Sequence, residues 1–131
     1  FYAHTHLCYF DMPSSAARMV LFRDTVIAAK EHKVDVVTVA KTDLKAGTVL
    51  DGIGGYHSYG VCENIGPSLA ERMLPMGLSE GCRLLRDIRC DEIIGYDDVE
   101  VPEGRISDSL RKSMIDRCFT DTKHLEVISN R

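Results

Sequence analysis

The sequence lacks the features that mark several common classes of protein. It contains no tryptophan, few aromatic residues, and no apolar run close to the roughly 18 residues that a membrane-spanning helix needs. No dense basic patch occurs and the net charge is −4, so we expect no nucleic-acid partner. The charged-then-apolar pattern of a secretory signal peptide is absent as well. We therefore expect a globular domain with no membrane and no nucleic acid as partner.

The cysteines form neither a zinc motif nor a disulfide framework. They are Cys8, Cys62, Cys82, Cys90 and Cys118. Their number is odd and no C-x-x-C pair occurs, which is more typical of a reducing compartment than of a secreted domain. We therefore expect a cytoplasmic protein. The chain begins at Phe1 and not at methionine, which favours a piece of a longer chain.

Local patterns predict a mainly β chain with short helices. Aromatic and polar residues alternate approximately over residues 1–10, which favours a strand, and good helix formers follow Pro13 in the first turn of a helix. The valine-rich residues 34–41 are typical of a strand that is covered on both faces. A short helix is expected near residues 66–81, and a C-terminal helix is expected to follow Ser107 as its N-cap. Its apolar stripe, expected to dock on something, consists of Leu110, Met114, Ile115 and Cys118.

Two stretches that lie 44 positions apart share one order of residue types. Residues 43–50 and 87–94 both run acid, aliphatic, base, small, turn former, polar, β-branched, aliphatic. Gly47 and Asp91 occupy the turn position, and both residue types tolerate a left-handed backbone. We therefore expect two copies of one turn-and-strand unit, packed about a pseudo-twofold axis.

The glycine-rich stretch DGIGGYHSYG, residues 51–60, does not fit a phosphate-binding loop. A G-x-G-x-x-G fingerprint that starts at Gly52 needs glycine at position 57, where the chain has His57. We expect that Gly52, Gly54 and Gly55 instead let two backbone segments cross closely.

Three longer stretches resemble one known domain family. VVTVAKTDLKAGTVLDGIGGY, LPMGLSEGCRLLRDI and DEIIGYDDVEVPEGR together resemble the SAF domain, named for sialic acid synthases, type III antifreeze proteins and a flagellar assembly chaperone. In that family K-x-D-L-x-x-G-x-x-L and R-D-I-x-x-D-E-x-I are the two repeats of a β-clip, a small contorted β fold with pseudo-twofold symmetry. The resemblance implies a β-clip (SAF-like) domain over 34–104, a linking strand and helix over 1–33, and a C-terminal helix and tail over 105–131.

Shorter motifs resemble a narrower group within that family. DGIGGY, LPMGL-x-EG and YDDVE-x-P-x-GR are similar to the C-terminal SAF region of homoserine dehydrogenase-like NAD(P)-dependent oxidoreductases, which include deoxyxylulose-phosphate reductoisomerase-like enzymes. The resemblance covers about residues 5–106 and implies that a Rossmann domain and a catalytic domain precede this region as its partners. NAD(P) would then belong to the parent enzyme, and the fragment would hold no cofactor and no catalytic residue. Its role would be assembly, including a possible homo-oligomer, or shaping of the active site.

The alternative function is a stand-alone SAF module that binds a sugar acid or a protein partner. The resemblance to sialic acid synthases implies the sugar acid, for which the candidate cations are Lys41, Lys45, Arg83 and Arg86. The candidate ligand or interface residues are Gly54, Gly55, Tyr56, Tyr59, Met76, Gly77 and Leu78. The two tyrosines offer amphipathic rings with a hydroxyl each, suited to a shallow groove, to docking on another domain, or to the small core.

Other residue clusters favour structural explanations over chemical ones. A weak candidate metal site consists of His4, His6 and Cys8, which would share one face of a strand, with Asp11 as a fourth ligand. His57 and Cys62 would point to opposite faces of a strand, so a buried structural cysteine is expected in place of a nucleophile and its base. Four acids could hold a hard cation or serve acid–base chemistry, but a solvated strand end is favoured. They are Glu92, Asp97, Asp98 and Glu100.

Overall fold

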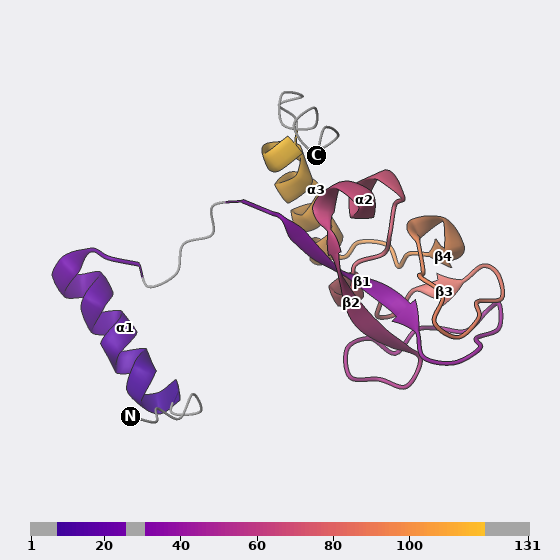
Figure 1. The fold of residues 1–131 in the computed structure, drawn as a ribbon, viewed down its shortest axis with the longest axis horizontal. Helices are drawn as coiled ribbons and strands as arrows, with labels where there is room; N and C mark the ends of the chain where they lie inside the picture. The colour runs from indigo at the N-terminus through magenta and orange to yellow at the C-terminus, as the bar shows by residue number, and fades with distance from the viewer. Residues whose placement is uncertain (1–7, 26–30, 120–131) are drawn as a thin grey trace. The chain divides into compact units, whose positions relative to one another are not determined.

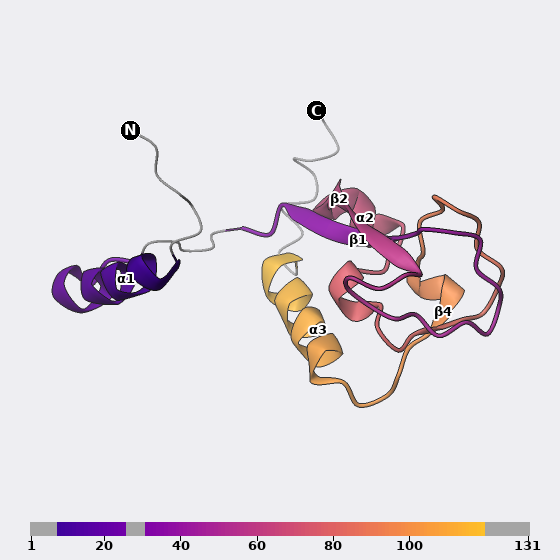
Figure 2. The ribbon, with the colours of Figure 1, turned by 90° about the horizontal axis from the view of Figure 1, so that it is seen from below.

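The computed structural model describes residues 8–25 and 31–119. The chain divides into two compact units, Phe1–Glu31 and His32–Arg131, and each is described by itself. Figure 1 shows the ribbon and Figure 2 shows it turned by 90°. Over the described ranges the fold is mixed α/β and not mainly β, with two small antiparallel sheets and three α-helices. No helix in those ranges is long and apolar enough to cross a membrane.

In the first unit, a helix occupies part of the segment for which a strand was predicted. α1 spans Cys8–Phe22, so the predicted strand is wrong for residues 8–10, and residues 1–7 lie outside the described part. The backbone of a strand needs a neighbouring strand to bond with, and the described part of this unit contains none. The hydrogen bonds of a helix join residues that are close in the sequence, so a helix needs no such neighbour, and good helix formers follow Pro13. Pro13 lies inside α1, beyond its first turn.

The second unit contains β1, the valine-rich strand that the sequence predicts. β1 spans Val34–Ala40 and pairs antiparallel with β2, Ser58–Asn64. Its β-branched side chains suit a pleated, packed surface. The prediction that both faces are covered is confirmed for residues 37–40, whereas Val34 and Val36 are about half exposed. The outer half of the strand therefore contributes apolar side chains to the surface.

The two repeats bond to each other with exchanged roles. Leu44 and Ile88 each donate the backbone N–H to the other's carbonyl, at 2.8 and 2.9 Å. Three more pairs of backbone bonds are related by the same shift of 44 positions, with the N–H donor named first in each bond. The first pair is Gly47 to Leu84 and Asp91 to Ala40, and the second is Leu84 to Thr48 and Ala40 to Glu92. The third pair is Leu50 to Cys82 and Ile94 to Thr38. A local twofold axis between two copies would produce an exchange of this kind. The hydrogen bonds therefore support the predicted packing of the two repeats.

The leading acids of the two repeats also exchange roles. Asp87 Oδ1 accepts the backbone N–H of Ala46 at 2.9 Å, and Asp43 Oδ1 accepts that of Cys90 at 2.8 Å. Each carboxylate thus satisfies a backbone donor in the turn of the other repeat, where a sheet partner is missing. These two bonds tie each turn to the opposite copy.

The turn residues of both repeats have the left-handed backbone that was predicted. The φ angle is +86° at Gly47 and +63° at Asp91. The residue that follows each turn residue closes the turn: Thr48 donates its N–H to the Lys45 carbonyl, and Glu92 donates its N–H to the Arg89 carbonyl, both at 3.1 Å. The tight turns allow the chain to fold back onto the other repeat.

Apolar side chains from both repeats and from the segment between them form one core. Its largest fully buried members are Leu50, Leu74, Leu84, Ile88 and Ile94. The remaining elements are short, and β3 pairs antiparallel with β4. They are α2 (Ile65–Ala70), η1 (Met76–Leu78), β3 (Arg83–Leu84), η2 (Tyr96–Asp98) and β4 (Val99–Glu100). The helix predicted between the repeats is α2.

The predicted C-terminal helix is α3, which spans Ile106–Phe119. It begins one residue before Ser107, which is therefore not its N-cap. The predicted apolar stripe does not dock as a unit, because Leu110 is 64% exposed and Cys118 is exposed, while Met114 and Ile115 are half-buried. The described contacts between α3 and the rest of the second unit include hydrogen bonds and an ion pair of a charged side chain.

Two arginines attach α3 to the rest of the second unit. Arg105 Nη1, just before the helix, donates to the carbonyls of Leu78 at 3.0 Å and Glu80 at 2.8 Å. Arg111 binds both carboxylate oxygens of Asp35 on β1, and Asp35 is only 7% exposed. A bidentate pair of this kind fixes orientation as well as distance, so it sets how α3 lies against the strand.

Candidate functional site

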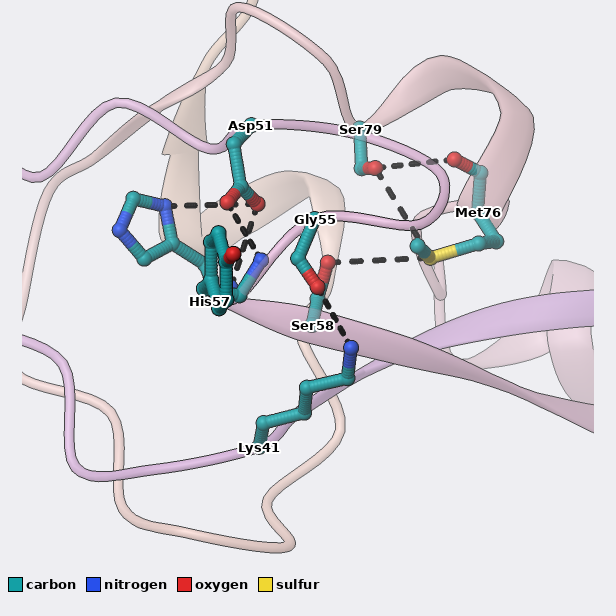
Figure 3. A network of polar contacts seen from close by, with 8 residues as sticks. Lys41, Asp51, Gly55, His57, Ser58, Met76 and Ser79 are labelled. Atoms are coloured by element: carbon teal, nitrogen blue, oxygen red, sulfur yellow. Dashed lines mark hydrogen bonds and ion pairs between the residues drawn. The ribbon is translucent and has the colours of Figure 1, made fainter.

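The candidate residues surround a glycine-rich loop that Asp51 organises (Figure 3). The Asp51 carboxylate accepts the backbone N–H of Tyr56 at 2.5 Å and that of His57 at 3.2 Å. The bond from Tyr56, followed by that from His57, outweighs desolvation and holds the pKa of Asp51 below its ordinary value. Asp51 therefore stays ionised, and its charge closes the loop.

The predicted close crossing of two chain segments is found at one of the loop glycines, Gly52. Gly52 has φ +78°, and a Cβ there would lie 2.8 Å from Cβ of Glu80, on a separate segment. Gly54 has the same φ but open space around it, so only its backbone conformation requires glycine. A Cβ at Gly55 would meet the Asp51 carboxylate, which belongs to the same loop.

A shallow groove of about 460 Å³ lies beside this loop. Four of the predicted ligand or interface residues line it, namely Gly54, Tyr59, Met76 and Gly77. Five lining residues were not among the predicted ligand or interface residues, namely Val36, Lys41, Ile53, Ser58 and Gly60. Of the five, only Lys41 had been singled out, as a candidate cation. The register of β1 with β2 brings these positions together, and a single sequence does not reveal that register.

The other three predicted residues lie away from the groove lining. Leu78 is part of the apolar core and 8% exposed. Tyr56 is 88% exposed at the loop, close to Ile53, which is 76% exposed. Gly55 contributes its carbonyl, which accepts a hydrogen bond from Lys41 Nζ at 2.5 Å. The loop thus presents apolar surface beside the groove.

Lys41 differs from the other candidate cations. Three of them pair with carboxylates, namely Lys45 with Asp87 at 2.7 Å, Arg83 with Glu100 at 3.9 Å, and Arg86 with Asp98 at 2.6 Å. Within the described residues the Lys41 ammonium has no carboxylate partner. It donates to the Gly55 carbonyl, as Figure 3 shows. Its charge is therefore available to an anion at the rim of the groove.

Two hydroxyl groups, those of Tyr59 and Ser58, contribute polar atoms to the groove. Tyr59 Oη donates to Asp91 Oδ1 at 2.9 Å, and this bond raises the pKa of Tyr59, so the phenol stays protonated. The Ser58 hydroxyl is buried and faces Met76 Sδ at 3.8 Å. Among the described residues the Ser58 hydroxyl contacts no carboxylate or imidazole that could act as its general base, and the Asp91 carboxylate leaves the Tyr59 phenol protonated.

The acidic cluster is bound by arginines. Arg86 contacts Glu92 at 2.7 Å and Asp98 at 2.6 Å, and the Arg89 N–H, followed by Arg86, holds the pKa of Glu92 below its ordinary value. Asp97 and Glu100 face Arg72 and Arg83, respectively. The expected solvation is confirmed for Asp97 and Glu100, whose side chains are 76% and 69% exposed. Each of the four carboxylates has a cationic neighbour, which opposes the expected repulsion. In the described ranges no cluster of side chains has the make-up of a metal site.

The cysteine predictions have mixed outcomes. His4, His6 and the side chain of Cys8 lie outside the described residues. Cys62 is exposed, so the expected buried role is wrong: it lies opposite Val36, which is itself 46% exposed. The buried thiol is Cys82, and desolvation raises its pKa against the opposing effect of Arg105.

Comparison with known proteins does not identify the chain. No protein-family model matches it, and no curated protein matches it. The case for a function therefore depends on the repeats, the groove and the charges described above.

Proposed function

We propose that residues 34–104 form a SAF-type β-clip domain and that the chain is the C-terminal SAF region of a homoserine dehydrogenase-like NAD(P)-dependent oxidoreductase. The region takes no part in the redox chemistry, and a cytoplasmic location belongs to the same proposal. The observation that carries it is the exchange of hydrogen bonds between Leu44 and Ile88 and around them. This exchange falls on the two motifs that resemble the SAF repeats, at equivalent positions in each.

In this proposal the glycine-rich loop docks against the preceding catalytic domain and shapes its substrate entrance. Ile53 and Tyr56 are the exposed apolar side chains of the loop. Apolar side chains that stand out on a rigid loop suit an interface between domains. Asp51 fixes the loop from within, so docking would require little ordering.

The coding sequence upstream of Phe1 tests this proposal. We expect it to encode a strand, a G-x-G-x-x-G turn and a helix, and the full-length protein to bind NADPH in a fluorescence titration. Replacement of Tyr56 by Ser should lower kcat/KM with the native substrate without changing the NADPH affinity, whereas Leu85→Ser, at an exposed apolar residue elsewhere, should change neither. A start codon within a few residues of Phe1, or a full-length chain without NADPH affinity, would contradict the proposal.

A second candidate is a SAF module that binds a sugar acid on its own. The observation that favours it is the Lys41 ammonium, which has no carboxylate partner within the described residues, at the rim of a groove with a mostly apolar lining. An NMR titration with N-acetylneuraminic acid should then shift the amides of Gly54, Tyr59 and Gly77. Lys41→Met should abolish the shifts and Lys45→Met should preserve them, and wild-type spectra that do not change would exclude this candidate.

A further inference from the structure

The outer edge of β2 carries backbone groups that point away from the protein. Thr38 and Ala40 of β1 donate their N–H groups to Leu74 and Glu92, away from β2. Because successive N–H groups of a strand point to opposite edges, the odd-numbered residues of β1 bond to the odd-numbered residues of β2. The N–H and C=O groups at positions 58, 60 and 62 therefore face outward. β1 is thus bonded on both edges, and β2 on one.

None of the segments in the described ranges bonds to this outer edge. β2 is seven residues long and contains neither proline nor lysine, two residues that commonly protect edge strands. Its only ionisable carboxylate is Glu63, and Val61 is 42% exposed. Val36, on the neighbouring strand, is 46% exposed. A long unprotected edge with apolar side chains beside it is a template for another strand.

We propose that β2 pairs antiparallel with β2 of a second copy of this chain, so that one continuous sheet runs through the dimer. The pairing has a twofold axis, and in its favoured register Gly60 lies opposite Gly60 of the second copy. Gly60 is exposed and faces the outer edge, so the two backbones can form a pair of N–H···O=C bonds at the axis. This association does not depend on the function proposed above.

Side-chain complementarity selects both the partner and the register. With the axis at Gly60, each Val61 lies opposite Tyr59 of the other copy, which gives two favourable pairs of a β-branched and an aromatic side chain. With the axis at Val61, the two Val61 side chains would face each other in a single pair. Glu63 does not separate the two registers, because it approaches a carboxylate in both: opposite Tyr59 it would approach Asp91, and opposite His57 it approaches Asp51, which lies 3.5 Å from the His57 ring. The register with Gly60 on the axis is therefore favoured by the pairs of Val61 with Tyr59.

The dimer should be weak. Two paired strands bury less surface than the roughly 1,600 Å² of a standard stable interface. We expect a dissociation constant on the order of 10 µM to 1 mM.

Sedimentation velocity of the 131-residue protein over that concentration range tests the proposal. Wild type should shift from monomer to dimer, and Val61→Lys should weaken the dimer about tenfold or more. Leu85→Lys, at an apolar side chain that is 59% exposed and outside β2, is the matched control and should dimerise as wild type does. Should Val61→Lys fail to fold by circular dichroism, Cys62→Lys, at an exposed position of the same edge, replaces it.

The register is tested by oxidative cross-linking of Val61→Cys in a Cys62→Ser background, with Leu85→Cys in the same background as a control at an exposed residue outside β2. With Gly60 on the axis the two introduced thiols lie opposite Tyr59 and not opposite each other, so Val61→Cys should form no more covalent dimer than the control. Efficient formation of a covalent dimer by Val61→Cys would put Val61 on the axis and overturn the register. A protein that stays monomeric over the whole range, or a dimer that neither edge variant weakens, would overturn the proposal itself.

Discussion

Leu44 and Ile88 donate backbone N–H groups to each other's carbonyl, although 44 positions separate them in the chain. Around this pair each repeat supplies the hydrogen-bond partners that the other one lacks. Neither repeat has a complete sheet of its own, so the two should fold and unfold together. The apolar core, to which both contribute, has the same consequence.

Substitution by alanine should lower the free energy of unfolding by different amounts at Gly47 and Gly52. Gly47 has φ +86° with open space around it, so Gly47→Ala should lower the free energy of unfolding only by the backbone strain, about 1–2 kcal/mol. Gly52 has φ +78°, and its added Cβ would also lie 2.8 Å from Cβ of Glu80, so Gly52→Ala should cost more. Urea denaturation of both variants provides the comparison. Equal losses would contradict the close approach of the two segments at Gly52.

The buried Asp35 should make stability depend on acid pH. Burial alone would raise the pKa of Asp35, but the hydrogen bond and charge of Arg111, with Ser68 and His32, outweigh it and lower the pKa. A carboxyl that is harder to protonate in the folded state stabilises the fold fully above the ordinary aspartate pKa of about 3.9, and less as the pH falls toward the native value.

Asp35→Asn should therefore destabilise the protein by about 3 kcal/mol at neutral pH, because Arg111 loses its charged partner. The difference from wild type should narrow below about pH 4. Thermal or urea unfolding at several pH values measures it. Asp97→Asn, which removes an exposed pair with Arg72, should cost less than about 0.5 kcal/mol, and a similar loss for both variants would count against the buried pair.

The cysteines should react at different rates with a thiol reagent. Cys82 is fully buried, so a reagent cannot reach its sulfur, and desolvation raises its pKa, so little of the reactive thiolate forms. Cys62, Cys90 and Cys118 are exposed. Peptide mapping after a brief native treatment with iodoacetamide should find Cys82 unmodified and Cys62 and Cys118 modified, with Cys82 reacting only in denaturant. Modification of native Cys82 at the rate of Cys62 would contradict the described core.

Sequence reasoning succeeded where structure is local. The β-branched run gave β1, and the turn position gave the left-handed backbone at Gly47 and Asp91. It failed where distant partners decide. A strand was predicted over residues 1–10 from alternation, but no strand in the described part of that unit is present to pair with it.

The candidate site was predicted only in part for the same reason. Gly54 and Tyr59 followed from the unusual loop composition, whereas Gly60 enters the groove through a strand register that the sequence does not encode locally. Asp35 stands inside a valine-rich run, which signals a buried charge in need of a partner. That partner is Arg111, 76 residues away, and nothing near either residue indicates it.

Amide hydrogen exchange measured by NMR tests the interlocking of the repeats most directly. If each acid supports the turn of the opposite repeat, Asp43→Ala should speed exchange most at Cys90 and Asp91, and Asp87→Ala should do so at Ala46 and Gly47. Faster exchange confined to the repeat that carries the substitution would contradict the account.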